Sequence, residues 1–315
     1  MPADTLLTAI RAHLKLPPTH QVLMEPVQKG ASGRTVIRLQ PEGYPTFIGV
    51  HYTLDRADNA NFMPVARFLK KSGLKVPEVL YDNPARRVAL VEDLGNEELM
   101  TLKDKPFAER KKHYLSIFKQ LDKLLYTRPP KDFELQPKFD EAMYGWEQGY
   151  FLDYYVSGIL GREIESLRDD PALLALRKGL GASAPHLVHR DLQSQNVMIF
   201  KDEAYLLDFQ GMRMGRQEYD LASLLYDPYM DLSSEEREEL LDGWEDITEE
   251  RPIETVLRDC AAQRLMQALG AFGNIVTQQQ NDWYVPRMEI ASRLLREVVK
   301  ESPLEESIRR ALGEE

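Results

Sequence analysis

The sequence predicts an α+β protein of two lobes, a small β-rich N-terminal lobe and a larger, mainly helical C-terminal lobe. Up to residue 92, short apolar segments alternate with turn residues, a pattern typical of strands. Beyond residue 95, apolar residues recur mostly at the spacing of helices. The 315 residues are 43% hydrophobic and 29% charged, which is enough apolar material for a sizeable core. We therefore place the two lobes at residues 1–95 and 96–315.

The N-terminal lobe is expected to hold two helices and five strands. The expected helices cover residues 4–14 and 62–71, and the expected strands cover residues 22–27, 35–39, 46–52, 76–81 and 87–91. Ser72 and Gly73 follow the second helix and are typical of a helix end. A tight turn joins the first two strands and contains Gly30, Ala31, Ser32, Gly33 and Arg34.

Charge and cysteine content exclude several classes of function. The chain has 51 acidic and 40 basic residues, a net charge of −11, which argues against binding nucleic acid through the overall field. The single cysteine, Cys260, rules out an intrachain disulfide. The first 20 residues lack the apolar stretch of a signal peptide, and no run approaches the length of a membrane span. We expect a cytoplasmic monomer or weak homodimer that binds a small molecule, with neither a nucleic-acid nor a membrane partner.

Residues 189–196 read His-Arg-Asp-Leu-Gln-Ser-Gln-Asn and carry the strongest functional signal in the chain. They match the catalytic-loop pattern H-R-D-L-x-x-x-N of kinases at every fixed position. In such a loop, Asp191 accepts or orients the proton of the attacking hydroxyl. A polar surface loop beside a buried hairpin is the alternative, which agreement at so many positions disfavours. The segment therefore predicts a phosphotransferase active centre.

A predicted hairpin follows this loop and brings two candidate metal ligands together. Residues 197–200 and 204–207 resemble short strands, and residues 201–203 would turn between them. Asn196 stands at the entrance of the hairpin and Asp208 at its exit. Amide and carboxylate oxygens are hard ligands of the kind that Mg²⁺ prefers. The hairpin therefore predicts a Mg²⁺ site at Asn196 and Asp208.

The N-terminal lobe is expected to bind ATP. Backbone N–H groups of the glycine-containing turn and the Ser32 hydroxyl would donate to phosphate oxygens, although a plain hairpin turn is the alternative. After the last strand, backbone groups of Glu92 and Leu94 would hydrogen-bond the edge of the adenine. We therefore assign the nucleotide to the turn at residues 30–34 together with Glu92 and Leu94.

One element of protein kinases is missing, namely the third-strand lysine that pairs with a glutamate of the following helix. Residues 47–52 contain no lysine, and residues 61–71 contain no acidic residue. Losing both avoids leaving one buried charge unpaired, which would be costly. A substitute cation is then needed near the phosphates, and its position makes Arg34 a better candidate than Arg38. Alternatively, both arginines are exposed strand residues.

The chain resembles the aminoglycoside phosphotransferase and choline kinase superfamily of small-molecule kinases. The resemblance is carried by residues 189–196, by Asp208-Phe209-Gln210 and by residues 219–225. Within that superfamily the chain is similar to the bacterial anomeric amino-sugar kinases, which phosphorylate N-acetylmuramate and N-acetylglucosamine at the C1 hydroxyl. Those enzymes also have a Gly-Ala-Ser-x-Arg type of loop and lack the third-strand lysine.

This resemblance implies a bilobal protein kinase-like fold, ATP and Mg²⁺ as cofactors, and a sugar hydroxyl as acceptor. Asp191 would be the catalytic base, and Asn196 and Asp208 would bind Mg²⁺. Asp220 would brace the catalytic loop through backbone hydrogen bonds, with His189 as further support. An N-cap on the helix at residues 221–225 is compatible with that role of Asp220. An aminoglycoside or amino-alcohol kinase and a nucleotide-binding pseudokinase are the alternative functions.

The acceptor is expected to contact the C-terminal lobe. Glu147 lies in an aromatic-rich helix at residues 144–151, and aromatic rings with one carboxylate suit a sugar. Asp227 follows the predicted helix after Asp220 and would line the same cleft. Arg213 would meet a carboxylate or phosphate of the substrate. For Glu147, the alternative is a core helix that carries this residue at its surface. For Arg213 and Arg216, the alternative is that at least one of the two faces water.

Overall fold

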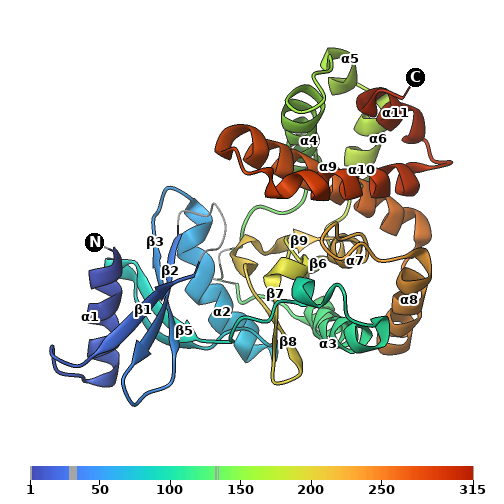
Figure 1. Ribbon diagram of the computed structural model, residues 1–315. Coiled ribbons are helices and arrows are strands. Elements are labelled where there is room, and N and C mark those ends of the chain that lie inside the picture. The colour runs from blue at the N-terminus through green and yellow to red at the C-terminus, as the bar shows by residue number, and fades with distance from the viewer. Residues whose placement is uncertain (1, 28–33, 132, 134, 315) are drawn as a thin grey trace.

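The predicted α+β class and its two lobes are found in the structure, a computed structural model that describes residues 2–27, 34–131, 133 and 135–314. A five-stranded sheet with a helix on either side lies beside a larger helical part (Figure 1). The N-terminal helix lies at the outer side of the sheet, and the C-terminal helices lie at the far end of the helical part (Figure 1).

The sheet is antiparallel throughout, with the strand order β1-β2-β3-β5-β4. The expected strand at residues 76–81 begins only at Val79, because Pro77 has no N–H to donate to a neighbouring strand. The strands are β1 (Val22–Pro26), β2 (Arg34–Pro41), β3 (Phe47–Tyr52), β4 (Val79–Asn83) and β5 (Val88–Glu92).

Two helices cover the sheet, α1 (Pro2–Leu14) on one face and α2 (Phe62–Lys71) on the other. Alternate residues of β5 point to opposite faces and so separate two cores. Val88 and Leu90 join a small outer core beneath α1. Ala89 and Val91 join the large core that continues through α2 into the helical part. The sheet is thereby packed on both faces, and only the α2 face continues toward the helical part.

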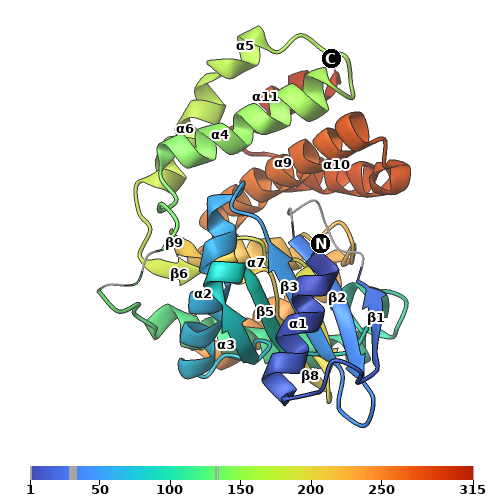
Figure 2. The ribbon, with the colours of Figure 1, turned by 90° about the vertical axis from the view of Figure 1, so that its left-hand side faces the viewer.

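The helical part is built around one long buried helix, α9 (Glu254–Gln279), against which α4, α7 and α10 pack (Figures 1 and 2). The other helices are α3 (Phe107–Tyr126), α4 (Glu141–Phe151), α5 (Glu165–Arg168), α6 (Pro171–Gly181), α7 (Gln217–Leu225), α8 (Ser234–Thr248), α10 (Val285–Val299) and α11 (Glu305–Leu312). Short helical turns complete it: η1 (Ala57–Asn61), η2 (Pro84–Arg86), η3 (Leu99–Leu102), η4 (Leu152–Ser157, a π-helix), η5 (Ser194–Asn196), η6 (Phe209–Gly211) and η7 (Asp282–Tyr284).

Two small antiparallel ribbons of two strands each lie next to the segment at residues 189–196 that matches the kinase motif. The first is the expected hairpin, β7 (Val197–Phe200) with β8 (Glu203–Leu206). Lys201 and Asp202 have φ values of 51° and 65°, as a tight two-residue turn requires, so Glu203 belongs to the strand rather than to the expected turn. The second ribbon, β6 (His186–Val188) with β9 (Arg213–Gly215), was not predicted, because three-residue strands are too short to show alternation.

Candidate active site

The catalytic-loop segment begins directly after β6 and is held at its first residues by Asp220 of α7. The backbone N–H groups of His189 and Arg190 donate to the two carboxylate oxygens of Asp220, at 2.6 and 2.9 Å. Arg190 has φ 80°, which is uncommon for a non-glycine residue, and these bonds hold it there. Burial raises the pKa of Asp220 to about 7. His189 Nε2 lies 2.8 Å from the carbonyl oxygen of Leu207, next to Asp208.

A second buried aspartate, Asp227, holds the other end of the loop. Its Oδ2 accepts a hydrogen bond from the Ser194 N–H at 2.6 Å, and its Oδ1 accepts one from the Tyr229 N–H at 2.9 Å. The residue is only 1% exposed. We expected Asp227 to line the acceptor cleft, whereas its carboxylate turns inward, because two backbone N–H groups need an acceptor there.

Asp191 lies between the two loop segments that Asp220 and Asp227 hold, and a quarter of its side chain is exposed. Arg190 Nη1 donates to Asp191 Oδ2 at 3.1 Å. Asn196 Nδ2 donates to the backbone carbonyl of Asp191 at 2.8 Å, which leaves the Asn196 side-chain oxygen for another partner. The geometry therefore presents one open carboxylate and one amide oxygen from the same short loop.

Asp208 follows the hairpin and meets Arg34, which lies at the start of β2. The Arg34 guanidinium makes an ion pair with Asp208 Oδ1 and donates to Gln210 Oε1 at 3.3 Å. Gln210 Nε2 in turn donates to Asp208 Oδ1 at 2.9 Å. Burial alone would raise the pKa of Asp208, but Arg34 and Gln210 outweigh it and hold this pKa below its ordinary value. Arg34 is thus the cation that reaches the expected metal ligand.

Arg38 has a different role from Arg34, because it holds the segment that follows β5. Its Nε donates to Asp93 Oδ2 at 2.7 Å, and its Nη2 donates to the Gly95 carbonyl at 2.9 Å and to Asn96 Oδ1 at 2.7 Å. The side chains of Arg34 and Arg38 are 12% and 15% exposed, so they are not the exposed strand residues of the alternative interpretation.

The two residues expected to meet adenine, Glu92 and Leu94, flank Asp93 in this clamped segment. The N–H of Glu92 already donates to the Glu78 carbonyl at 2.9 Å. Leu94 is 5% exposed. Gly30, Ala31, Ser32 and Gly33 of the expected phosphate loop lie outside the described residues. Nucleotide contacts at all these positions therefore stay a prediction.

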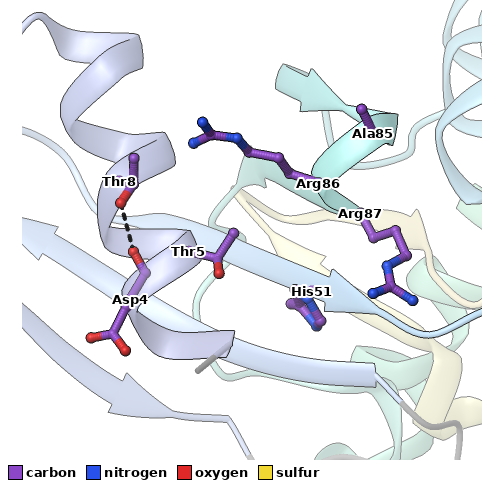
Figure 3. Close-up of a pocket in the computed structure, with 7 residues that line it drawn as sticks. All are labelled: Asp4, Thr5, Thr8, His51, Ala85, Arg86 and Arg87. Carbon is purple, nitrogen blue, oxygen red and sulfur yellow. Dashed lines mark hydrogen bonds between the residues drawn. The ribbon is translucent and has the colours of Figure 1, made fainter.

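Aromatic rings pack where α2 meets the segment that follows Asp208. The ring of Phe209 stacks on Phe62 of α2 with centroids 5.1 Å apart, and the Arg34 guanidinium lies 5.6 Å from the Phe62 ring centroid. His51 of β3 points to the opposite, α1 face of the sheet. There it lines a hollow of about 430 Å³ together with Asp4, Thr5, Thr8, Ala85, Arg86 and Arg87 (Figure 3). His51 therefore does not supply the cation that the missing lysine would have provided.

The residues at the loop and hairpin fit a Mg²⁺ ion that is carried by a nucleotide. The described residues contain no group of three or more His, Cys, Asp or Glu side chains placed to hold a metal ion. Asp208 and Asn196 offer one carboxylate and one amide oxygen. A Mg²⁺ ion that keeps phosphate oxygens and waters as its other ligands needs only such a pair from the protein.

Glu147 of α4 is completely buried, so it is neither an open sugar ligand nor a surface residue. Its Oε1 accepts a hydrogen bond from the Tyr219 hydroxyl at 3.0 Å, and its Oε2 accepts one from Gln263 Nε2 at 3.1 Å. Burial raises the pKa of Glu147, against the opposing effects of Arg190 and these hydrogen bonds. The expected contact with an acceptor would require both partners to be displaced.

Arg213 is buried rather than exposed to water, at 4% exposure. Its Nε donates to the Gly211 carbonyl at 3.0 Å, and its guanidinium lies 5.1 Å from the Phe139 ring centroid. Burial and the nearby Arg190 lower its pKa. Arg216 is also held by the protein, through a bond from Nε to the Leu180 carbonyl at 3.1 Å. Of the two arginines, Arg213 does not face water and Arg216 is partly exposed, and the contact of Arg213 with substrate stays a prediction.

Three residues of this site were not assigned from the sequence. Arg190 and Gln210 lie next to motif residues, and that adjacency is the signal that would have pointed to them. Arg264 of α9 donates to Gln193 Oε1 at 3.2 Å, and no local pattern marks it because α9 is distant in sequence from the loop.

Among the residues that the structure describes, none of the helices combines the length and the apolar character that a membrane span requires.

Comparison with known sequences agrees with this site. The profile of the phosphotransferase enzyme family matches residues 24–255. The N-acetylmuramate/N-acetylglucosamine kinase of Neisseria meningitidis serogroup B is 27% identical over 180 residues, which cover 55% of this chain and 54% of the relative. The enzyme of the same name from Pseudomonas aeruginosa is 26% identical over 220 residues, which cover 69% of this chain and 62% of the relative. The matched region thus spans little more than half the length of these relatives.

Solved structures share the fold at low identity. The choline kinase LicA from Streptococcus pneumoniae superimposes with a TM-score of 0.67 at 16% identity, covering 94% of this chain and 100% of that chain. The ADP-bound aminoglycoside phosphotransferase APH(2'')-Ib has a TM-score of 0.58 at 13% identity, covering 91% and 96% of the two chains. These likenesses confirm the bilobal, kinase-like fold expected from the sequence.

Proposed function

The chain belongs to the phosphotransferase enzyme family, and from this premise we propose that it is an ATP-dependent kinase of a sugar hydroxyl. We propose the anomeric hydroxyl of an N-acetylated amino sugar as the acceptor group. The observation that carries the proposal is the placement of Asp191, Asn196 and Asp208 on one loop and hairpin. The names of the curated relatives support the sugar, and the ADP-bound neighbour supports the nucleotide.

The proposed reaction is an in-line displacement at the γ-phosphorus of ATP. The sugar hydroxyl oxygen bonds to phosphorus, the bond from phosphorus to the ADP oxygen breaks, and Asp191 takes the hydroxyl proton. Arg190 orients the Asp191 carboxylate through its bond to Oδ2. Asn196 and Asp208 would hold Mg²⁺, which when bound neutralises charge on the phosphates.

Asp220 and Asp227 act in this proposal as positioning residues. They bond backbone N–H groups at the two ends of the loop, so Asp191 is oriented before the acceptor arrives. Such orientation lowers the entropic part of the barrier. Neither carboxylate needs to touch substrate for this role.

The nucleotide would bind at residues 1–95, and the acceptor at residues 96–315. The turn at residues 30–33 and the segment of Glu92 and Leu94 would receive ATP. Arg34 would help to balance the phosphate charge, and Arg38 would keep the segment after β5 in place. A guanidinium suits both tasks because its donors form a rigid fork.

A cationic acceptor is the main alternative, since the structural neighbours include a choline kinase and aminoglycoside phosphotransferases. An aminoglycoside carries several ammonium groups and needs carboxylates that are open to it, whereas choline can also bind to aromatic rings. Glu147, Asp220 and Asp227 are all buried, and both oxygens of each accept hydrogen bonds from the protein. This observation favours a neutral or anionic sugar over an aminoglycoside. A non-catalytic nucleotide-binding role has no need of the open Asp191.

The test is ATP consumption with Mg²⁺ against N-acetylmuramate, N-acetylglucosamine, unmodified hexoses, choline and aminoglycosides. We expect turnover with an N-acetylated amino sugar and, in Asp191→Asn, a loss of kcat on the order of 1,000-fold with ATP binding retained. Turnover with choline or an aminoglycoside alone would replace the sugar with the alternative acceptor. ATP binding without turnover of any acceptor would overturn the kinase reaction itself.

A further inference from the structure

The aromatic residues of α4 divide between two faces of the helix. Tyr144 and Phe151 are buried in the core. Trp146, which is 53% exposed, begins a row that continues with Tyr150 and Tyr154. Trp146 and Tyr150 stack with ring centroids 5.1 Å apart and an interplanar angle of 16°, and Tyr150 meets Tyr154 edge to face at 4.8 Å. These three residues, at every fourth position, form one stripe that we name the aromatic row.

The aromatic row is held rigidly against α9. A Cβ at Gly270 would lie 2.8 Å from backbone atoms of Tyr150, and a Cβ at Gly273 would lie 2.5 Å from the Tyr154 carbonyl oxygen. The two backbones therefore touch only because α9 carries glycine at both positions. A platform fixed by backbone contact suits ligand binding, because its rings need no ordering when a ligand arrives.

The loop between β3 and α2 reaches from the sheet toward α4 and α9 (Figure 2). The side chain of Asn274 of α9 lies close enough to the Tyr150 phenol to lower its pKa. Burial raises the pKa of the Tyr150 phenol, and Arg56 of this loop is close enough to oppose that rise. The row thus has an amide and a guanidinium beside it, the guanidinium from the opposite lobe.

The same loop connects the aromatic row with the catalytic loop. Arg56 Nη2 pairs with Asp58 Oδ2 at 3.0 Å. Asp58 lies near enough to Arg190 to raise its pKa, to which the adjacent Asp191 contributes most. η1, which contains Asp58, also contacts η6, which follows Asp208. The loop that carries Arg56 and Asp58 therefore lies near both the aromatic row and the catalytic loop.

We propose that the aromatic row is the surface on which the acceptor sugar ring stacks, with Trp146 as the principal contact. Arg56 is then the residue that favours an acceptor with a carboxylate, such as N-acetylmuramate, over one without, such as N-acetylglucosamine. An aromatic ring packs on the apolar face of a pyranose, and the Asn274 amide lies within reach of its polar rim. This inference rests on the proposed sugar kinase function and names its specificity residues.

Steady-state kinetics test the proposal. Trp146→Ala is expected to raise the KM for the amino sugar roughly tenfold and to leave the KM for ATP within about twofold, because only acceptor binding loses a contact. Trp146→Phe, which keeps a ring, should recover most of the loss. Arg56→Gln should raise the KM for N-acetylmuramate alone. Tyr126→Ala, at a 75% exposed ring on α3, is the control and should change nothing.

Tryptophan fluorescence gives a readout that does not depend on turnover. The chain has three tryptophans, of which Trp244 is buried at 1% exposure and Trp283 is 40% exposed. Titration with N-acetylmuramate should change the emission of the wild type and of Trp283→Phe, but not that of Trp146→Phe. An active Trp146→Ala enzyme with an unchanged sugar KM would overturn this inference and leave the proposed function standing. Absence of both turnover and a fluorescence change with every sugar would overturn both.

Discussion

At the scale of single residues, we propose that Arg34 takes the place of the cation that protein kinases have on the third strand. It comes from β2 and reaches Asp208 and Gln210 with one guanidinium. The β3 residues offer no comparable group, because His51 faces α1. The Asp208 side chain is only 34% exposed, and such a partly buried carboxylate is harder to ionise without a cationic partner. The activity should therefore depend on Arg34 through the charge state of Asp208.

Replacing Arg34 by Gln is expected to lower kcat/KM on the order of 100-fold, since a charged donor near the phosphates is lost. The pKa of Asp208 lies below its ordinary value because Arg34 and Gln210 outweigh burial. Without Arg34, burial prevails, this pKa rises, and the metal ligand takes up a proton at higher pH. The acid limb of the kcat/KM profile, measured at limiting Mg²⁺, should move to higher pH.

The matched control is Arg67→Gln, which removes an arginine of α2 whose side chain is 54% exposed and pairs with Asp82. It should leave both the rate and the profile unchanged. An Arg34→Gln enzyme with a normal acid limb would show that Asp208 does not depend on Arg34 for its charge.

At the scale of elements, the crossing of α4 and α9 depends on two glycines. Gly270 and Gly273 let the backbone of α9 touch that of α4 and of the π-helix η4. A π-helix adds a residue to the turn and often occurs at functional sites. Here it continues directly from the helix that carries the aromatic row. The crossing is thus a feature of packing that serves the proposed acceptor site.

Gly273→Ala is expected to lower the free energy of unfolding by about 2 kcal/mol, because the added methyl group collides with a backbone oxygen that cannot move freely. Gly149→Ala in α4 is the matched control. A Cβ at Gly149 meets nothing within 4 Å, so alanine should stabilise by up to about 1 kcal/mol through its better helix propensity. Urea unfolding followed by circular dichroism measures both. Equal effects of the two substitutions would contradict the close crossing.

The strands were predictable to different degrees. Residues 197–200 match β7 because four apolar residues between polar neighbours mark a buried strand. β6 and β9 escaped prediction, since their pairing joins segments far apart in the sequence and each has only three residues. That ribbon places His189 and Asp208 on adjacent segments. The sequence therefore named the candidate catalytic residues without predicting the ribbon that brackets their loop.

At the scale of the whole molecule, the helical part carries buried carboxylates that shape stability against pH. Burial raises the pKa of Glu147, of Asp227 and of Asp220, the last to about 7 from an ordinary value of 3.8. Between these two pH values the folded protein retains a proton that the unfolded chain has released. Stability contributed by Asp220 therefore falls as pH rises through this window. The net charge of −11 adds self-repulsion in the same direction.

We expect Tm to fall by several degrees from about pH 5 to about pH 7, as measured by calorimetry without nucleotide. Asp220→Asn should flatten this dependence, because its amide does not titrate. The substitution should also lower Tm overall, since an amide nitrogen cannot accept a backbone N–H. A Tm that is constant or rises over the same range in the wild type would contradict a raised pKa of Asp220.

The sequence by itself determined the class of fold and the residues whose roles follow from local spacing. Asp191 and Asn196 lie within one loop, and Asp208 follows one hairpin, so their proximity needs no long-range contact. The tertiary structure alone decided which of two arginines meets Asp208, and that Asp227 and Glu147 turn inward while Trp146 turns outward. Helical periodicity shows that a helix has two faces, but it does not show which neighbouring element covers each face. In this protein α9 decides this by packing against one face of α4.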